Sequence, residues 1–299
     1  MDDPLKKLSC KTRMLNKIRL LFKKQPIEAF LIQKYQKGYR FFFKFFPSHY
    51  LYTNPTIRQV KKQSIGYLLD ISDYVDWWIY FDVVDIAHER LLQLCNHDDV
   101  VLDIGTNIGS TLLRFAQKTS LGTGRVIGFE PDSINYQKCL KNISLNNFTN
   151  IEVNKLGLGA SETSLYLITD TPINRGGNKI SPAMVTDSCE KEFVKIVSLD
   201  TFLAKKYLKS IDLIKIDVEG YEYEVLKGAK KTIFEYRPVL FIEIDDNNLK
   251  QQNSSASNVI SWLDDLGYSI KRADTLEPVD SNYEKFKNCH FDVICFIST

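Results

Sequence analysis

A short loop at residues 103–109, Asp-Ile-Gly-Thr-Asn-Ile-Gly, directly follows an apolar run and contains residue types that suit a small ligand. Gly105 can turn sharply, and neither Gly105 nor Gly109 has a Cβ that would obstruct a bound molecule. Asp103 can anchor the loop or meet a cationic ligand. Glu130 lies 25 residues after Gly105, where an acidic side chain typically binds ribose hydroxyls. The combination predicts a site for a nucleoside-type cofactor.

A nicotinamide dinucleotide is the alternative ligand for this loop. Its fingerprint, G-x-G-x-x-G, would place glycines at 107 and 110, but the sequence has Asn107 and Ser110 there. A pyrophosphate needs a close approach to the backbone, which the side chain of Asn107 hinders. The pattern therefore favours a cofactor without a pyrophosphate and disfavours a nicotinamide-dependent oxidoreductase.

A second group of acidic residues follows the apolar run at 211–216. Asp217 and Glu219 are two positions apart, and Gly220 allows a sharp turn after them. Carboxylates at a strand end are candidates for acid–base chemistry. The structural alternative is that Glu219 and Glu222 only favour the N-terminus of the helix that follows.

Three further polar residues are candidates for binding a substrate. Glu243 ends the next apolar run and could join Asp217 across adjacent strand ends. Together with Glu219, these two carboxylates would suit Mg²⁺. A hydrogen-bonded substrate site accounts for the same residues, and we expect no metal. Asn178 and Ser181 lie in a long polar loop, which offers either the donors and acceptors that a sugar needs or a plain surface.

The elements that must position these residues alternate regularly from residue 98 onward. Strand-length apolar runs at 100–104, 125–129, 151–153, 211–216 and 239–244 alternate with helical patterns at 110–118, 135–146 and 222–234. This alternation favours an α/β fold with a mainly parallel sheet and helices on both faces. In such a sheet, ligands bind beyond the carboxyl ends of the strands, where the candidate residues lie.

The composition is that of a folded protein. The chain has 299 residues, of which 44% are hydrophobic and 25% charged, which excludes a disordered chain, a collagen-like repeat and a small disulfide scaffold. None of the six cysteines forms a CxxC pair, so we expect free thiols. The sequence starts without an apolar leader and has no uncharged apolar run of membrane-spanning length, so we expect a cytoplasmic protein.

The charge is distributed unevenly. Residues 1–65 contain 15 Lys/Arg and 3 Asp/Glu, a local net charge of +12, whereas the remainder carries −10. We therefore expect residues 1–63 to form a basic, aromatic-rich helical extension, followed by a domain over residues 64–299. The extension could pack on the domain or on a second subunit of a homo-oligomer, or lie at an anionic membrane surface. Nucleic acid is not expected, because no recognition module is present.

Five segments resemble the FkbM-type S-adenosylmethionine-dependent methyltransferases: VVLDIGTNIGSTLLRFA (100–116), VIGFEPDSINYQKCLKNISLNN (126–147), LGLGASETSLYL (156–167), VSLDTF (197–202) and IDLIKIDVEGYEYEVLKGAKKTIFEYRPVLFIEI (211–244). The resemblance covers roughly residues 64–299 and is weak or absent before them. It implies a Rossmann-like class I methyltransferase fold, with a seven-stranded, mainly parallel sheet whose last strand is antiparallel. Residues 291–297 would form that strand.

The resemblance also assigns roles to residues. The methionine half of the cofactor would be lined by Asp103, Gly105, Asn107 and Gly109. Glu130 would hold the ribose hydroxyls, and Leu156 and Gly157 would lie near the adenine or merely end a strand. Asp217 and Glu219 would lie beside the transferred methyl group. The expected reaction is O-methylation of a hydroxyl on a glycan, sugar or natural product; an inactive methyltransferase fold that serves as an interaction module is the alternative.

Overall fold

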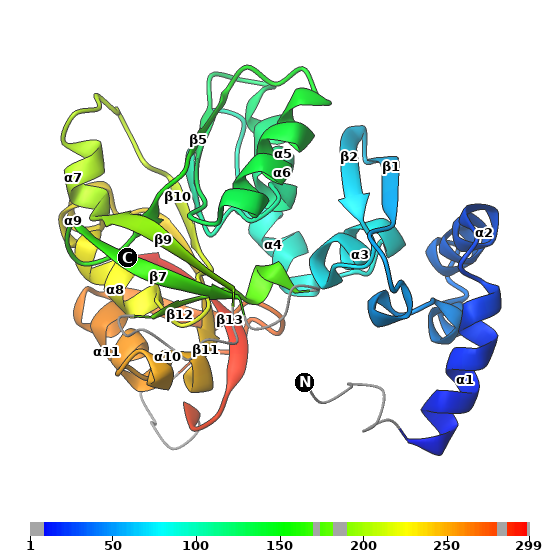
Figure 1. The fold of residues 1–299 in the computed structure, drawn as a ribbon. Coiled ribbons are helices and arrows are strands. Elements are labelled where there is room, and N and C mark those ends of the chain that lie inside the picture. Colours follow the sequence, from blue (N-terminus) through cyan, green and yellow to red (C-terminus); the bar gives the residue numbers. More distant parts are fainter. Residues whose placement is uncertain (1–8, 170–173, 182–189, 280–285, 298–299) are drawn as a thin grey trace. The chain divides into compact units, whose positions relative to one another are not determined.

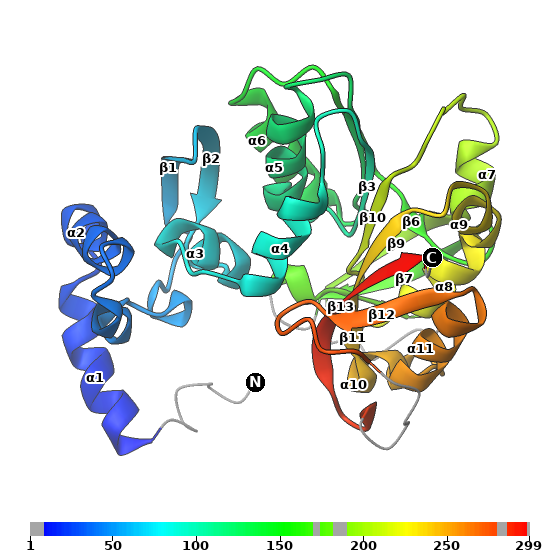
Figure 2. The ribbon, with the colours of Figure 1, turned by 180° about the vertical axis from the view of Figure 1, so that it is seen from behind.

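The computed structural model describes residues 9–169, 174–181, 190–279 and 286–297, and the chain forms two compact units (Figures 1 and 2). The N-terminal unit comprises Met1–Lys62, Gly66–Val84 and Thr171–Gly176. The sheet unit comprises Gln63–Ile65, Asp85–Asp170 and Gly177–Thr299.

The N-terminal unit is largely helical at its start, as the sequence predicts. Its elements are α1 (Cys10–Leu21), α2 (Gln25–Gln36), the 3₁₀ helices η2 (Arg40–Phe45) and η3 (His49–Leu51), strands β1 (Ile57–Lys62) and β2 (Ile65–Asp70), and α3 (Tyr74–Phe81). The buried carboxylate of Glu28 on α2 connects this helix to β1 and α3. It accepts hydrogen bonds from the guanidinium of Arg58 and from the hydroxyls of Tyr52 and Tyr80. Helix α2 is therefore tied to β1 and α3 within one unit.

The sheet unit is built on seven strands whose order confirms the predicted fold class. In spatial order they are β12 (Tyr268–Arg272), β13 (His290–Ile297), β11 (Val239–Asp245), β10 (Leu213–Ile216), β3 (Val100–Ile104), β4 (Arg125–Phe129) and β5 (Ile151–Asn154). Strand β13 is antiparallel to both of its neighbours, and the pairs among the remaining adjacent strands are parallel.

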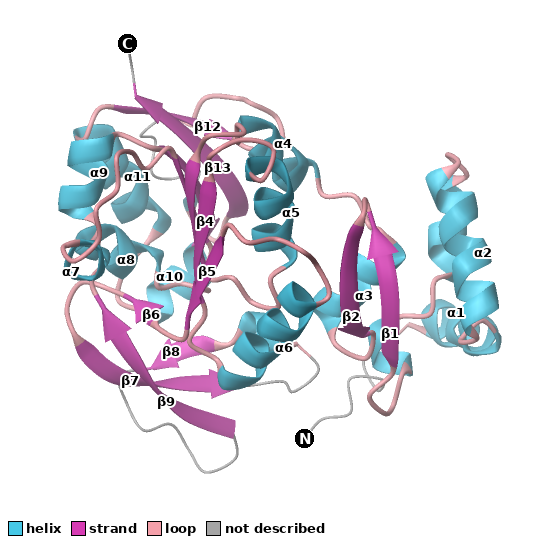
Figure 3. Ribbon diagram, turned by 90° about the horizontal axis from the view of Figure 1, so that it is seen from above, coloured by secondary structure: helices cyan, strands magenta, loops and turns pink. Residues whose placement is uncertain are grey.

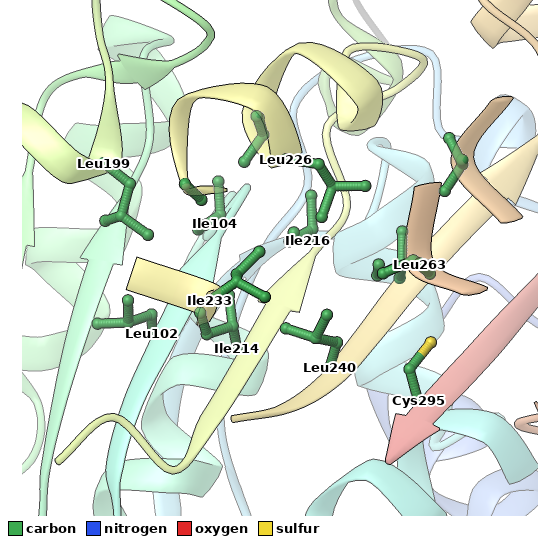
Figure 4. Close-up of a cluster of buried hydrophobic side chains, with 14 of the residues drawn as sticks. Leu102, Ile104, Leu199, Ile214, Ile216, Leu226, Ile233, Leu240, Leu263 and Cys295 are labelled. Carbon is green, nitrogen blue, oxygen red and sulfur yellow. The ribbon is translucent and has the colours of Figure 1, made fainter. Parts of the chain in front are cut away.

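Helices cover both faces of this sheet because successive strand residues point to opposite sides (Figure 3). One face packs against α4 (Ile86–Leu94), α5 (Ser110–Thr119) and α6 (Ser133–Ser144). The other packs against α7 (Leu199–Leu203), α8 (Glu222–Gly228), α9 (Lys230–Tyr236) and α11 (Ala256–Asp265), while α10 (Asp246–Gln251) follows β11. In β3, for example, Val101 contributes to the first core, and Leu102 and Ile104 contribute to the second (Figure 4).

The helix that the sequence predicts over 222–234 is divided in two at Ala229. The division follows a close approach at Gly228, where a Cβ would lie 1.9 Å from the carbonyl oxygen of Gly159. Such tight backbone packing leaves room only for glycine.

A second sheet lies in the sequence between β5 and β10. Its strands, in spatial order, are β6 (Gly157–Leu158), β9 (Glu190–Val197), β7 (Thr163–Thr169) and β8 (Lys179–Ser181), with the 3₁₀ helix η4 (Arg175–Gly177) before β8. The predicted polar loop over 169–190 thus contains a strand, and its residues 170–173 and 182–189 lie outside the described residues.

The register of the main sheet brings the candidate residues to one level. Ile104 pairs with Phe129 on one side and with Ile216 on the other, and Ile216 pairs with Ile242. The residues that come immediately afterwards are Gly105, Glu130, Asp217 and Glu243. All four therefore lie at the carboxyl edge of the sheet, where ligands of open α/β sheets bind.

Candidate active site

The loop after β3 adopts a conformation that its glycines make possible. The backbone φ angles are +84° at Gly105, +53° at Asn107 and +86° at Gly109. A Cβ on Gly105 would lie 1.8 Å from the carbonyl oxygen of Asp217, so only glycine allows the ends of β3 and β10 to meet. Asn107 is among the residues that most readily tolerate a left-handed backbone. The loop is thus bent tightly against the end of β10.

Glu130 ties this loop to the end of β4. Its Oε2 accepts the backbone N–H of Asn107 at 2.7 Å, and its Oε1 accepts the backbone N–H of Asp132 at 2.9 Å. Burial raises the pKa of Glu130 to about 8. Each carboxylate oxygen has a further lone pair, so Glu130 can still accept hydrogen bonds from a ligand.

A buried lysine, Lys215, connects the two acidic groups that the sequence suggests. Its ammonium lies 3.4 Å from Asp103 Oδ1 and 3.1 Å from Asp217 Oδ2, and it donates to the carbonyl oxygen of Gly105 at 3.2 Å. Burial raises the pKa of Asp103. For Asp217, burial opposes ionisation, but the Lys215 ammonium prevails and holds the pKa of that carboxyl below its ordinary value. Asp217 is therefore ionised at neutral pH.

Asp103 differs from its neighbours in its hydrogen bonding. Its side chain is fully buried; Oδ1 faces the Lys215 ammonium at 3.4 Å, whereas Oδ2 has no hydrogen-bond partner among the described residues. A buried acceptor without a donor is energetically unfavourable. The geometry therefore suits a ligand that brings a donor to this carboxylate.

Two glutamates in the turn after β10 have different hydrogen-bond partners. Glu222 Oε1 accepts the backbone N–H groups of Val218 and Gly220, so Glu222 shapes the turn at the start of α8. Glu219 has a left-handed backbone, with φ +56°, and its Oε2 accepts the side-chain amide of Asn248 at 2.9 Å. Burial, with the charges of Glu243 and Asp217, raises the pKa of Glu219 to about 9. Glu219 therefore retains its proton at neutral pH.

Glu243 lies on the other side of Asp217. Its Oε1 is 3.1 Å from Nε2 of His290, and this hydrogen bond raises the pKa of His290 to about 9. Its Oε2 is buried without a hydrogen-bond partner in the described part of the chain. No group of three or more His, Cys, Asp or Glu side chains among the described residues is arranged to hold a metal ion.

The start of β8 contacts loops that follow two different strands. Asn178 Nδ2 donates to Asp132 Oδ2 at 2.9 Å, two residues past Glu130. Lys179 Nζ donates to Asn248 Oδ1 at 2.8 Å, and the same Asn248 donates to Glu219. Asn178 is thereby held near the cofactor side. Ser181 lies at the far end of β8, opposite Tyr166 of β7.

Leu156 and Gly157 lie where β5 leads into the second sheet. A Cβ on Gly157 would lie 2.4 Å from Ile196 Cδ1 and 3.7 Å from Pro131 Cβ. Since Pro131 directly follows Glu130, this strand end lies beside the Glu130 side of the site.

Comparison with known proteins agrees with this geometry. Residues 103–270, more than half of the chain, match the model of the family described as the methyltransferase FkbM domain. The chain belongs to the FkbM methyltransferase family. It is therefore an S-adenosylmethionine-dependent methyltransferase, as the sequence motifs predict.

Three known methyltransferases resemble this chain in sequence. Methyltransferase 1 of Beauveria bassiana is 26% identical over 201 residues, which cover 60% of this chain and 80% of the relative. The hexuronic acid methyltransferase AglP of Haloferax volcanii is 28% identical over 143 residues, covering 48% and 55% of the two chains. The 2-O-methyltransferase NoeI of Sinorhizobium fredii is 28% identical over 175 residues, covering 54% and 70%.

The described residues fit the cofactor of the FkbM family. S-adenosylmethionine carries an ammonium group, which matches the Oδ2 of Asp103 that Lys215 does not contact. It also carries a ribose diol, which matches the remaining acceptor capacity of Glu130. Gly105 and Gly109 leave the loop between these carboxylates without side chains.

Three further residues contact the candidate residues, although no sequence motif points to them: Lys215, Asn248 and His290. For Lys215 a signal exists, since it is the one charged residue in the apolar run Leu213–Ile216. For Asn248 and His290 no such signal is present, because their contacts with Glu219 and Glu243 join segments that are distant in the sequence.

Proposed function

We propose that this FkbM methyltransferase transfers the methyl group of S-adenosylmethionine to a hydroxyl oxygen of a sugar, glycan or natural product. The observation that carries this proposal is the pair of carboxyls at the end of β10: Asp217, 3.1 Å from the Lys215 ammonium that lowers its pKa, and Glu219, whose pKa is raised by burial. A hydroxyl acceptor needs both a group that takes its proton and a group that orients it. The names of NoeI and AglP, a 2-O-methyltransferase and a hexuronic acid methyltransferase, support a sugar acceptor.

The bound cofactor supplies a methyl carbon on a positively charged sulfur, which is open to attack by an oxygen nucleophile. Asp103 and Glu130, together with the loop backbone at Gly105, Asn107 and Gly109, bind and orient this cofactor. Leu156 and Gly157 border its adenine. Because much of the rate of a displacement comes from alignment, the tight bend of the loop against β10 serves to fix the distance to the acceptor.

Asp217 takes the proton of the acceptor hydroxyl. The Lys215 ammonium at 3.1 Å keeps the Asp217 carboxylate ionised before that step. Glu219 keeps its own proton and donates it in a hydrogen bond that orients the acceptor. The amide of Asn248 holds Glu219 Oε2 in place, at 2.9 Å.

The acceptor is bound by Glu243, which lies beside Asp217, and by polar residues of the segment around β8. Asn178 has a buried Oδ1 without a hydrogen-bond partner in the described residues, and Glu243 has an equivalent Oε2. Both can accept hydrogen bonds from sugar hydroxyls. Ser181 at the far end of β8 would extend the same surface.

Incubation with methyl-labelled S-adenosylmethionine and a panel of glycans, uronic acids and aglycone alcohols tests the proposal. Mass spectrometry and NMR of the product should show one added methyl group on oxygen. Transfer only to nitrogen or carbon acceptors would contradict O-methylation. Tight binding of S-adenosylhomocysteine without transfer to any acceptor would instead favour an inactive binding module.

A further inference from the structure

Helix α1 of the N-terminal unit turns apolar side chains toward solvent. Met14, Ile18 and Leu21 are 67%, 39% and 69% exposed. They are four and three positions apart, so they lie on one face of the helix. A surface helix of a globular protein ordinarily has the opposite arrangement, with its apolar stripe toward the core. We call these three residues the α1 stripe.

Polar contacts hold α1 in this orientation. Asn16 is buried and donates to the hydroxyl of Tyr50 at 3.3 Å. Arg19 donates to the carbonyl oxygen of Lys44 at 2.9 Å and to Asn16 Oδ1 at 3.1 Å. A rotation of the helix that buried the α1 stripe would break the hydrogen bonds to Tyr50 and Lys44, which lie outside α1. The outward position of the stripe is therefore fixed by the packing of its opposite face.

The surface around the α1 stripe is cationic. Lys11 precedes Met14 by three positions, and Lys17 lies three after Met14 and four before Leu21, so both flank the stripe. Residues 9–65 contain 13 Lys/Arg and a single acid, Glu28. That acid is fully buried and paired with Arg58. No acidic side chain within residues 9–65 therefore offsets the exposed positive charge.

A second group of exposed apolar residues lies on η2 in the same unit. Phe41 and Phe43 are 55% and 41% exposed. Exposed Arg40 and Lys44 stand next to them in the sequence, and the Lys44 ammonium lies 5.6 Å from the centre of the Phe41 ring. Aromatic rings interleaved with basic residues are typical of helices that lie in the membrane interface.

We propose that the α1 stripe and the lysines beside it form a docking surface for an anionic lipid bilayer. An anionic bilayer would attract the basic side chains and bury the apolar ones at the level of its headgroups. A second copy of the same face would bring positive charge against positive charge. No helix among the described residues is long and apolar enough to cross a membrane, so the surface attaches to a bilayer without spanning it.

Vesicle sedimentation of the full-length protein tests this proposal. We expect binding to vesicles of phosphatidylcholine and phosphatidylglycerol in equal parts, and little binding to phosphatidylcholine alone. Binding should weaken as salt is raised, because salt screens the attraction. Each basic residue near the surface strengthens binding about fivefold, so replacing Lys11 and Lys17 together by Gln should weaken it about twenty-five-fold.

The apolar contribution is tested separately. Met14→Gln, Ile18→Gln and Leu21→Gln combined should weaken vesicle binding at least about tenfold, since each apolar side chain that leaves water contributes to affinity. Glutamine is a good helix former, so α1 should persist. The matched control replaces Leu121, Ile134 and Phe234, exposed residues of the sheet unit, and should bind vesicles like the unaltered protein. Affinity for S-adenosylhomocysteine should be unchanged in every variant.

Three results would overturn the proposal. The first is an absence of vesicle binding by the folded, cofactor-binding protein. The second is equal binding to neutral and anionic vesicles. The third is a dimer in solution whose mass halves in the stripe variant while vesicle binding is unchanged, which would assign the face to a second copy of the chain.

Discussion

Lys215 and Asp103 lie opposite each other on the neighbouring strands β10 and β3, with the ammonium 3.4 Å from Asp103 Oδ1 and both side chains buried. The same ammonium contacts Asp217, so a single positive charge faces carboxylates that follow two neighbouring strands. In the reaction that we propose, this arrangement makes Lys215 a positioning residue for both the cofactor and the acceptor.

Replacing Lys215 by Met should leave the buried carboxylate of Asp103 and the half-buried carboxylate of Asp217 without their counter-charge. Removing one partner of a buried ion pair costs about 3–5 kcal/mol, and we expect a loss of this order in the free energy of unfolding. The pKa of Asp217 should rise, so the acidic limb of the pH–kcat profile should move to higher pH. Lys215→Arg should restore part of both properties.

The matched control for Lys215 is Lys227→Met, which removes an exposed ion pair with Glu224. Exposed pairs contribute about 0–1 kcal/mol, so stability and the pH profile should barely change. An acidic limb that stays in place in Lys215→Met would show that this lysine does not set the ionisation of Asp217.

Asp217→Asn should lower kcat about 10²–10⁴-fold, the range that a general base supplies, while affinity for S-adenosylmethionine stays within a few-fold. Glu219→Gln should be much milder, because Gln imitates a carboxyl that already holds its proton. Single-turnover kinetics and calorimetry measure the two quantities. An equal loss in both variants would mean that the two carboxyls do not divide their roles as we propose.

Glu130→Ala should weaken binding of S-adenosylmethionine by about tenfold or more, since removing one partner of a buried hydrogen bond costs about 1–3 kcal/mol. The variant loses the proposed ribose contact and also leaves the N–H groups of Asn107 and Asp132 without their acceptor. Glu152→Ala on β5, which breaks an ion pair with Lys206, is the control. Unchanged affinity in folded Glu130→Ala would remove Glu130 from the cofactor site.

The sheet and its ligand edge could be predicted from the sequence because they depend on local patterns. Apolar runs of strand length alternate with helices, and the side chains that follow such runs must lie at one edge of a parallel sheet. This reasoning led to Asp103, Glu130, Asp217 and Glu243 without any knowledge of distances.

The different roles of Glu219 and Glu222 could not be predicted in the same way. Whether Glu219 or Glu222 faces the site depends on the left-handed backbone at Glu219 and on two N–H groups that Glu222 accepts. A left-handed glutamate has no sequence signature, since this conformation is uncommon for residues other than glycine. The contact of Lys179 with Asn248 likewise joins residues 69 positions apart.

Glu222 should also make stability depend on pH, because its carboxyl is buried in the folded protein and exposed in the unfolded one. Burial raises its pKa from 4.5 to about 8. Between these values the folded chain holds a proton that the unfolded chain has released, so the free energy of unfolding should fall with rising pH, by up to about 1.4 kcal/mol per pH unit. The loss should be complete once the pH exceeds about 8.

Glu222→Gln keeps an acceptor oxygen for Val218 and Gly220 and cannot ionise, so its stability should decline less steeply over the same range. Urea denaturation at a series of pH values measures both slopes, and Glu224→Gln, which alters a glutamate on the same helix that pairs with Lys227, is the control. Identical slopes for Glu222→Gln and the unaltered protein would show that Glu222 is ionised in the folded state and that its turn is stabilised by a carboxylate.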